Sequence, residues 1–482
     1  MTKTPTMKTT LVSVILIIGL SFSSHLKAQI TFQKTYGGSE EDAGYYCQQT
    51  RDGGYILTGS TDSFGVGSRD VYLIKTDSLG DTLWTRIFGE QCSDGYYVRQ
   101  TTDGGYVIAG AADAFGLHGI FIIRTDSIGH IKWTKKVGGP GNIYPGSVQQ
   151  TNEGGFIFAA TQNAYPDHIS LTTTSALGDS LWTKTYDGNL CDVDVSVQQT
   201  NDGGFIIAGN AIKYIAGDIH RDFYLIKTDI DGNSVWTKTI GRPFDNICHS
   251  VQQTSDSGYI IVGGSATSYL GYSDVYLVKT NPMGDTLWTK IYSGSVDDVG
   301  YYVQQTHDGG YIITGTSCCY GGGGERAINL IRTNNAGDLI WTNIYTVRSG
   351  SYCYGYYVQQ TSDRGFVITG GSLLSDTDVC LIKTDSTGYA LTVGVNEMKA
   401  QPAEITISPN PFNVHATFVL KNFKTGKLNL TIYNTLGESI RKIADCSDGR
   451  IRIERNNLAN GLYFFTLTND TSIIGNGKFV IE

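Results

Sequence analysis

Apolar residues along most of the chain come in short runs that are separated by turn residues. In one unit, Tyr301–Thr306 and Tyr311–Gly315 flank an Asp-Gly-Gly triplet, in which glycine supplies the positive φ of a hairpin turn. Other runs, such as Val71–Ile74, are apolar at every position and do not alternate. Such runs are typical of strands that are buried on both faces. The pattern therefore predicts antiparallel hairpins whose third strands are covered on both sides.

This unit recurs along the chain at intervals of 49 to 55 residues. The motif Gln-Gln-Thr, or a near copy, ends at seven threonines: Thr50, Thr101, Thr151, Thr200, Thr254, Thr306 and Thr361. All six tryptophans follow the same period: Trp84, Trp133, Trp182, Trp236, Trp288 and Trp341. Each repeat supplies four antiparallel strands over about fifty residues, close to the kelch period. Repeats of this length and content predict the blades of a β-propeller.

The two ends of the repeat region predict how the ring of blades closes. The seventh repeat has Tyr389-Ala390-Leu391 where the other repeats have their tryptophan strand. At the other end, residues 32–38 resemble a fourth strand without the first three, with Phe32 at the tryptophan position. We therefore predict an all-β fold: a seven-bladed β-propeller over residues 29–395, with four-stranded blades, closed by the N-terminal strand. Closure in this way leaves no free edge strand.

Composition and charge narrow the class of protein further. The 482 residues include 60 Gly and 30 Tyr, and 40% are hydrophobic, which is enough for a large core and typical of many short strands. The formal net charge is −9. A nucleic-acid-binding surface is basic, so we expect no nucleic-acid partner.

The first 28 residues have the pattern of an export signal. Lys3 and Lys8 precede the apolar run Leu11–Leu20, and a short segment then ends at Ala28. This order predicts a secretory signal peptide over residues 1–28, cleaved between Ala28 and Gln29. The apolar run is short for a membrane span, and no second long run follows, so we expect no integral span in the mature chain.

A different pattern begins after the repeats. Residues 396–404 form a predicted linker, and residues 405–482 contain short strands that predict a small Ig-like β-sandwich. Its sequence includes Ser408–Phe412, Leu430–Asn434, Leu458–Phe464 and Lys478–Ile481. These motifs resemble the C-terminal sorting domain of the type IX secretion system (type A). The resemblance implies that residues 405–482 contact that secretion machinery and carry the protein across the outer membrane of a Gram-negative bacterium. The protein would then be secreted or held at the cell surface.

Candidate binding residues lie in loops of one face, where the second-to-third-strand loops and the interblade loops meet. Aromatic residues recur in the first set of loops and acids in the second: Phe64, Phe115, Tyr165, Tyr214, Tyr269, Tyr320, Asp42, Asp94, Asp192, Asp245 and Asp298. Rings and carboxylates together could stack on and hydrogen-bond a sugar, or grip a peptide. The alternative is that each ring packs its own loop against the neighbouring blade.

Motifs for chemistry are sparse. Nine cysteines do not recur at one place in the repeats; Cys319 and Cys353 lie in adjacent loops, where either a disulfide or two buried thiols would fit. The eight histidines show no paired metal-ligand spacing, and no nucleophile elbow or phosphate loop is present. We therefore expect no cofactor, no metal and no catalytic residues.

Three functions fit these patterns. The first is a non-catalytic binding module for extracellular glycan or protein. The second is an extracellular polysaccharide hydrolase or lyase on a propeller scaffold, and the third is a structural surface component.

Overall fold

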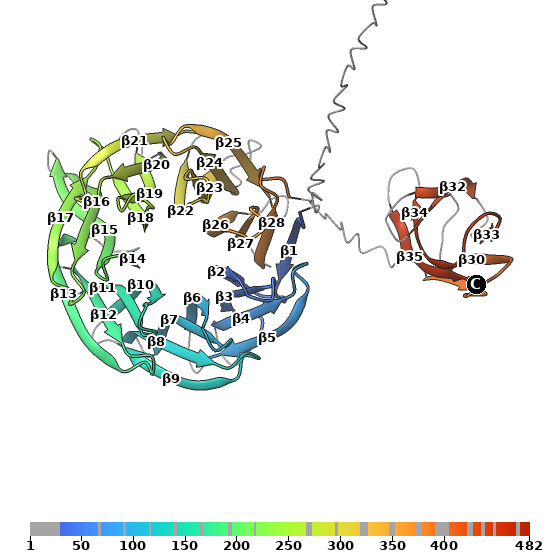
Figure 1. The fold of residues 1–482 in the computed structure, drawn as a ribbon, viewed down its shortest axis with the longest axis horizontal. Helices are drawn as coiled ribbons and strands as arrows, with labels where there is room; N and C mark the ends of the chain where they lie inside the picture. Colours follow the sequence, from blue (N-terminus) through green and yellow to red (C-terminus); the bar gives the residue numbers. More distant parts are fainter. Residues whose placement is uncertain are drawn as a thin grey trace, which may run out of the picture. The chain divides into compact units, whose positions relative to one another are not determined.

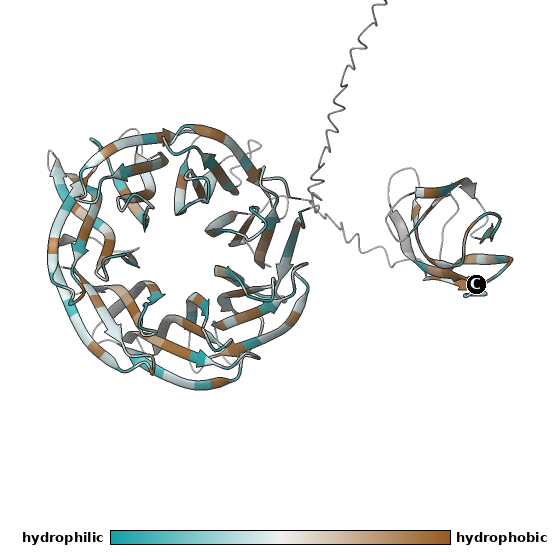
Figure 2. Cartoon of the chain, viewed as in Figure 1, coloured by the Kyte–Doolittle hydropathy of each residue, from teal (hydrophilic) through white to brown (hydrophobic). Residues whose placement is uncertain are grey.

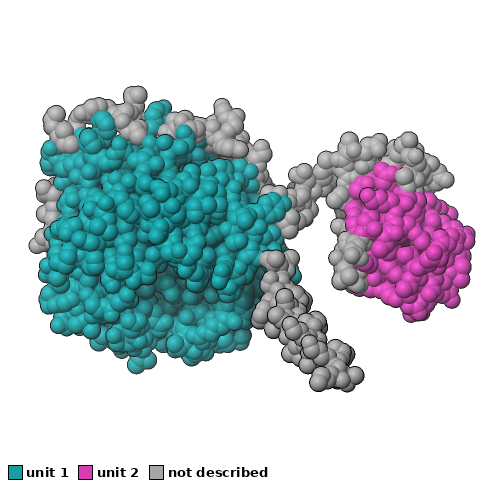
Figure 3. Space-filling model, turned by 45° about the horizontal axis from the view of Figure 1, so that its top comes forward, with its two compact units in different colours: residues 1–393 teal, residues 394–482 magenta. Residues whose placement is uncertain are grey.

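The computed structural model describes the chain in two compact units, residues 1–393 and 394–482 (Figure 3). The residues described are 29–65, 69–89, 93–114, 117–137, 142–163, 167–190, 195–215, 218–266, 272–294, 297–318, 326–346, 352–372, 378–390, 404–421, 428–434, 439–446, 450–468 and 473–482. The predicted signal peptide and its cleavage point at Ala28 fall at or before the start of this range.

The first unit is a ring of seven antiparallel four-stranded blades around an open centre (Figure 1). This arrangement confirms the predicted seven-bladed propeller. The innermost strands of blades 1 to 7 are β2 (Asp42–Gln49), β6 (Ser93–Gln100), β10 (Asn142–Gln150), β14 (Ser196–Gln199), β18 (Asn246–Gln253), β22 (Asp298–Gln305) and β26 (Cys353–Gln360). The second strands are β3 (Tyr55–Thr61), β7 (Tyr106–Ala114), β11 (Phe156–Asn163), β15 (Phe205–Ile215), β19 (Tyr259–Ala266), β23 (Tyr311–Cys318) and β27 (Phe366–Ser372).

The remaining strands complete each blade outward. The third strands are β4 (Asp70–Thr76), β8 (Leu117–Thr125), β12 (Asp167–Thr174), β16 (Asp218–Thr228), β20 (Ser273–Thr280), β24 (Arg326–Thr333) and β28 (Val379–Thr384). The outer strands are β5 (Thr82–Phe88), β9 (Ile131–Val137), β13 (Ser180–Leu190), β17 (Ser234–Ile240), β21 (Thr286–Tyr292), β25 (Leu339–Tyr345) and, in blade 7, β1 (Phe32–Tyr36).

The core lies in the second and third strands. Every residue of β3 and of β4 is buried, whereas most of β5 is partly or fully exposed. Figure 2 shows apolar residues on the strands all around the ring. The unbroken apolar runs therefore belong, as predicted, to strands that neighbouring blades cover on both faces.

The N-terminal strand closes the ring. β1 pairs antiparallel with β28, from Phe32 opposite Lys383 to Tyr36 opposite Val379. Blade 7 thus takes its outer strand from the start of the chain, which confirms the predicted closure.

One contact repeats around the outer rim and includes Phe32. Each tryptophan of an outer strand packs against a glycine in the turn that follows the third strand of the next blade. A Cβ added at Gly129 would lie 2.9 Å from the Trp84 ring, and one added at Gly388 would lie 2.7 Å from the Trp341 ring. At the closure, a Cβ on Gly80 would lie 2.7 Å from the Phe32 ring. Phe32 therefore occupies the position that tryptophan takes in the other six blades.

The second unit is a β-sandwich of two antiparallel sheets. One sheet contains β29 (Glu404–Ser408), β30 (His415–Lys421) and β33 (Arg450–Glu454). The other contains β31 (Leu428–Tyr433), β32 (Ser439–Cys446), β34 (Gly461–Thr468) and β35 (Ile473–Ile481). Burial alternates residue by residue along β31 and β33, so each sheet buries one face.

Candidate functional site

The predicted aromatic rim is described at two of its six positions. Phe64 is 39% exposed and Tyr214 is 66% exposed. The Phe64 ring lies 5.7 Å from the ring of Tyr72 in the same blade, so it packs in part against its own sheet. The other four positions, Phe115, Tyr165, Tyr269 and Tyr320, lie outside the described residues.

Two of the predicted acids are fully buried and bind the backbone of their own interblade loops. The Asp42 carboxylate accepts hydrogen bonds from the Gly38 N–H at 2.8 Å and from the Ser63 hydroxyl at 2.7 Å. The Asp298 carboxylate accepts one from the Gly294 N–H at 2.6 Å. Burial raises the pKa of Asp298 above its usual value. Both acids hold the chain where it passes from one blade to the next.

Two further acids are partly buried and form ion pairs. Asp245 lies 2.6 Å from the Arg221 guanidinium, and Asp94 lies 3.9 Å from that of Arg69. Burial raises the pKa of Asp94, and Arg69 opposes that rise. Asp192 lies outside the described residues. A binding role for the eleven rim residues remains a prediction.

The predicted disulfide also remains a prediction. Cys353 is fully buried, and Cys319 lies outside the described residues. Burial raises the pKa of the Cys380 thiol, with a further contribution from nearby Cys353. A low-reactivity, neutral thiol is the form favoured by such surroundings.

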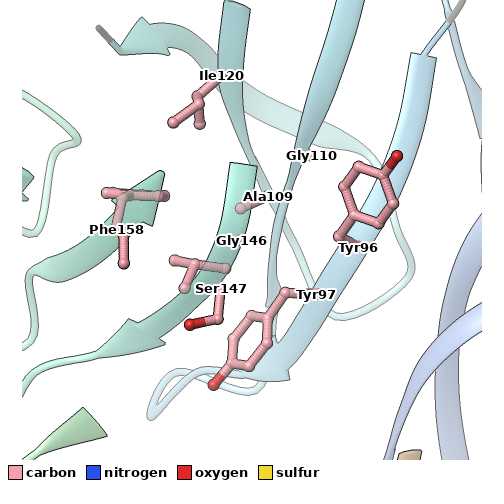
Figure 4. Close-up of a pocket in the computed structure, with 10 residues that line it drawn as sticks. Tyr96, Tyr97, Ala109, Gly110, Ile120, Gly146, Ser147 and Phe158 are labelled. Atoms are coloured by element: carbon pink, nitrogen blue, oxygen red, sulfur yellow. The ribbon is translucent and has the colours of Figure 1, made fainter. Parts of the chain in front are cut away.

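The innermost strands supply a second candidate site, a central channel. A β-bulge interrupts the pairing of these strands with their neighbours; in blade 1 it lies between Gly44 and Tyr46. The same irregularity occurs in blades 2, 3, 5, 6 and 7. Successive residues of a regular strand point to opposite faces, and a bulge re-aims one of them. Figure 4 shows Tyr96 and Tyr97 leaving the same strand in different directions.

Three rings of residues line this channel. The bulge ring consists of Tyr45, Tyr96, Gly146, Val195, His249, Tyr301 and Tyr356. The middle ring consists of Tyr46, Tyr97, Ser147, Ser196, Ser250, Tyr302 and Tyr357. The amide ring consists of Gln48, Arg99, Gln149, Gln198, Gln252, Gln304 and Gln359, and all of these except Gln48 line the channel cavity. Each ring takes one residue from the same position of each blade.

Tyrosines occupy only one side of the middle ring. Ring centroids are 4.4 Å apart for Tyr302 and Tyr357, 3.8 Å for Tyr357 and Tyr46, and 4.4 Å for Tyr46 and Tyr97. These four residues form a continuous aromatic arc over blades 6, 7, 1 and 2. Blades 3, 4 and 5 have serine at the same position.

The bulge ring has the same asymmetry. Tyr301, Tyr356, Tyr45 and Tyr96 follow one another at centroid distances of 5.6, 5.5 and 5.0 Å. His249 of blade 5 extends this arc, at 5.0 Å from Tyr301. Blades 3 and 4 contribute only Gly146 and Val195. Two layers of aromatic rings thus cover the same side of the channel.

The small side chains opposite leave open space. The channel encloses a cavity of about 290 Å³, at the low end of the range for small-molecule sites. A second cavity, of about 10 Å³, lies where blades 2 and 3 meet, between Tyr97 and Ser147 (Figure 4). No described residue that lines the channel cavity is acidic.

Hydrogen bonds join the blades along the amide ring. In six blades the side-chain oxygen of the ring glutamine accepts the backbone N–H of the second glutamine in the next blade, at 2.5 to 2.9 Å. The glutamine pairs therefore have a structural role in joining neighbouring blades. Blade 2 departs from the pattern because residue 99 is arginine. The Arg99 Nε–H donates to the Tyr97 hydroxyl at 2.6 Å.

Sequence reasoning placed the candidate site in the loops and overlooked this channel. A signal was present: Tyr-Tyr pairs precede the glutamines in four repeats, and Gly-Ser, Val-Ser and His-Ser replace them in the three others. Arg99 is likewise the one departure from Gln at the first position of the seven Gln-Gln-Thr motifs. The repeats therefore differ at the residues that face the axis.

Comparisons with known proteins identify the second unit. Residues 406–482 match the family model described as the secretion system C-terminal sorting domain. This segment is a secretion sorting domain. It directs the protein through the type IX route to the cell surface or the medium, as the resemblance implied. A search of the curated proteins finds no match for the chain.

Solved structures are similar to this chain at low sequence identity. A puromycin hydrolase is 12% identical at a TM-score of 0.51, with 80% of this chain and 59% of that chain covered. A fungal alcohol oxidase in complex with copper is 12% identical at 0.44, with 93% and 98% covered. The extracellular domain of a putative hybrid two-component system from B. thetaiotaomicron is 8% identical at 0.32, with 91% and 67% covered. At such identities the likeness concerns the fold alone.

Two observations bear on membranes and metals. Among the residues that the structure describes, no helix is long and apolar enough to cross a membrane. The described part of the chain also holds no group of three or more His, Cys, Asp or Glu side chains placed to bind a metal ion.

Proposed function

We propose that the exported propeller is a non-catalytic binding module for an extracellular glycan, and that the ligand enters the central channel. The observation that carries this proposal is the asymmetry of the channel. Seven equivalent tyrosines would be explained by packing alone, because every blade needs the same contact. Here tyrosines occupy four neighbouring blades and serines occupy the other three. The tyrosines therefore form a wall on one side of the channel, and the serines leave open space on the other side.

The chemistry of the wall favours a sugar. Tyrosine offers a flat apolar face to the C–H groups of a sugar ring and a hydroxyl for hydrogen bonds. The bulge-ring tyrosines are partly exposed, and the side chains of Gln198 and Gln252 line the same cavity. A cavity of mixed apolar and polar lining is the usual form of a small-molecule site.

The test exploits residues that the ring already tolerates. Tyr45→Val and Tyr356→Val copy Val195, the residue of blade 4 at the same position. Both variants should fold and should bind at least tenfold more weakly on a glycan array and in titration calorimetry. Tyr389→Ala removes an exposed tyrosine in an outer turn and is the matched control.

The alternative functions give different results in the same experiments. Release of reducing ends from polysaccharide would support the hydrolase or lyase, and failure to bind any glycan or protein would support a structural surface component. If both channel variants bind as tightly as the wild type, the binding site lies outside the channel, and the predicted loop rim becomes the candidate.

Delivery to the surface has its own test. Deleting residues 405–482 should trap the propeller in the periplasm, because the sorting domain is the part that the secretion route requires. The trapped propeller should keep its melting temperature, since its core lies in the first unit. Normal secretion of the truncated chain would contradict the sorting role.

A further inference from the structure

Arg99 breaks the ring of interblade hydrogen bonds. Glutamine supplies the acceptor oxygen at the other six positions of the amide ring. A guanidinium has five N–H donors and no acceptor, so arginine cannot make the equivalent bond to blade 3. In place of that interblade bond, the Arg99 side chain donates to the Tyr97 hydroxyl of its own strand.

Arg99 has no counter-ion among the residues that the structure describes. Within the described residues, no ion pair joins its guanidinium to a carboxylate, and the groups near it include four tyrosines, Tyr46, Tyr97, Tyr302 and Tyr357. Its Cζ atom lies 5.8 Å from the centre of the Tyr97 ring. A half-buried guanidinium that faces a cavity without acidic residues is a ready receptor for an anion, because arginine binds carboxylates and related oxyanions in a bidentate manner.

The tyrosines of the middle ring line the same cavity as Arg99. Burial raises the pKa of Tyr46 to about 12 and raises those of Tyr97, Tyr302 and Tyr357, so all four phenols keep their protons. A protonated phenol can donate a hydrogen bond to an anion. Hydrogen bonds join Tyr46 to Tyr97 and Tyr357, and Tyr302 to Tyr357, so the middle ring of blades 6, 7, 1 and 2 presents a linked set of neutral phenols near Arg99.

The serines opposite offer donors of the same kind. The Ser147 hydroxyl oxygen accepts the Val197 N–H at 2.6 Å, and that of Ser196 accepts the Val251 N–H at 3.2 Å. Each hydroxyl thus keeps its own proton for another partner. The Ser250 hydroxyl is buried, lines the cavity, and has no hydrogen-bond partner in the described protein. A buried polar atom without a partner is costly unless a ligand satisfies it.

We infer that the channel selects an acidic saccharide, whose carboxylate or sulfate group binds Arg99 while a sugar ring stacks on the tyrosine arc. This inference rests on the proposed glycan-binding function and specifies its ligand. The aromatic layers favour a saccharide over a simple anion, because an ion has no face to stack. The net charge of −9 repels polyanions from the protein surface as a whole. Binding of an acidic sugar would therefore indicate a specific site.

The experiment measures binding of four tetrasaccharide probes to the protein expressed from residue 29. The probes are tetragalacturonate, its full methyl ester, a sulfated tetrasaccharide and neutral cellotetraose. Tetragalacturonate or the sulfated probe should bind at least tenfold more tightly than the ester and the neutral probe; which of the two is tighter distinguishes carboxylate from sulfate. Arg99→Gln, which copies the other six blades, should weaken the acidic probe about ten- to a hundredfold. Arg99→Lys should weaken it less, and Arg86→Gln, on the outer rim, should not change it.

Each remaining outcome contradicts one stated part of the proposal. Equal binding of acid and ester, unaffected by Arg99→Gln, overturns the acidic selectivity and leaves the glycan-binding function standing. If the protein binds a peptide with a free carboxyl terminus and binds no saccharide, the claim that the ligand is a saccharide is wrong. No binding of any probe or glycan overturns the proposed function itself.

Discussion

The outer rim and the central channel of the propeller are built from the same seven repeats in opposite ways. On the rim, an aromatic ring meets a turn glycine in every blade, and even Phe32 takes the place of tryptophan. In the channel, the residues at equivalent positions divide into tyrosines on one side and serines on the other. A contact that all blades need is structural, whereas a position at which blades differ is free to serve a ligand. The predictions below test this distinction.

The largest effect is expected at the closure of the ring. Phe32→Ala should lower the free energy of unfolding by about 3–5 kcal/mol, because it empties a buried aromatic site at the single strand that joins the two ends. Phe32→Trp should restore most of the stability, since tryptophan fills this site in the other blades. Chemical denaturation measures both variants. Unchanged stability of Phe32→Ala would show that β1 is not needed for closure.

The turn glycines give a smaller effect with an internal control. Gly129 and Gly104 lie in the same blade with φ of +84° and +85°, so alanine meets a similar backbone penalty at both. A Cβ at Gly129 would also lie 2.9 Å from the Trp84 ring, whereas a Cβ at Gly104 would meet no atom within 4 Å. Gly129→Ala should therefore cost about 1–3 kcal/mol more than Gly104→Ala. Equal costs in thermal unfolding would contradict the rim packing.

The smallest effect concerns pH. The hydrogen bond from Thr101, opposed by slight burial and assisted by Lys132 and Arg124, holds the pKa of Asp103 well below its usual value. A depressed pKa stabilises the fold above the unfolded value of about 4 and loses that contribution as the pH falls through the folded value. Because the carboxylate is 49% exposed and solvent screens it, Asp103→Asn should cost at most about 1 kcal/mol at pH 7. Unfolding curves at pH 7 and pH 3 should differ less for the variant than for the wild type.

Sequence patterns predicted the fold well because it depends on repetition. The period, the tryptophans and Phe32 were sufficient to place β1 beside β28. In the structure Lys34 pairs with Leu381 and Thr35 with Cys380, as closure by the N-terminal strand requires. The sorting domain was predicted from its own short motifs.

The channel could not be predicted in the same way. Two adjacent tyrosines cannot both reach one face of a regular strand, and the bulge that permits this leaves little trace in the sequence. The surroundings of Arg99 include Tyr302 and Tyr357, which are more than two hundred residues away and become neighbours only through closure of the ring. Asp42 and Asp298 show the converse: their loop positions suggested exposure, and the fold buries both.

Arg99→Gln tests the central claim most directly, because it gives blade 2 the glutamine that the other six blades have at this position. The free energy of unfolding and the affinity for tetragalacturonate and for the sulfated tetrasaccharide would be measured on the same preparation. We predict that stability stays the same or rises by about 1 kcal/mol, as the missing interblade bond becomes available, while affinity for the preferred acidic probe falls at least tenfold. A loss of more than about 1 kcal/mol of stability with unchanged affinity would show that Arg99 is a structural residue, and that the difference between blades does not mark the site.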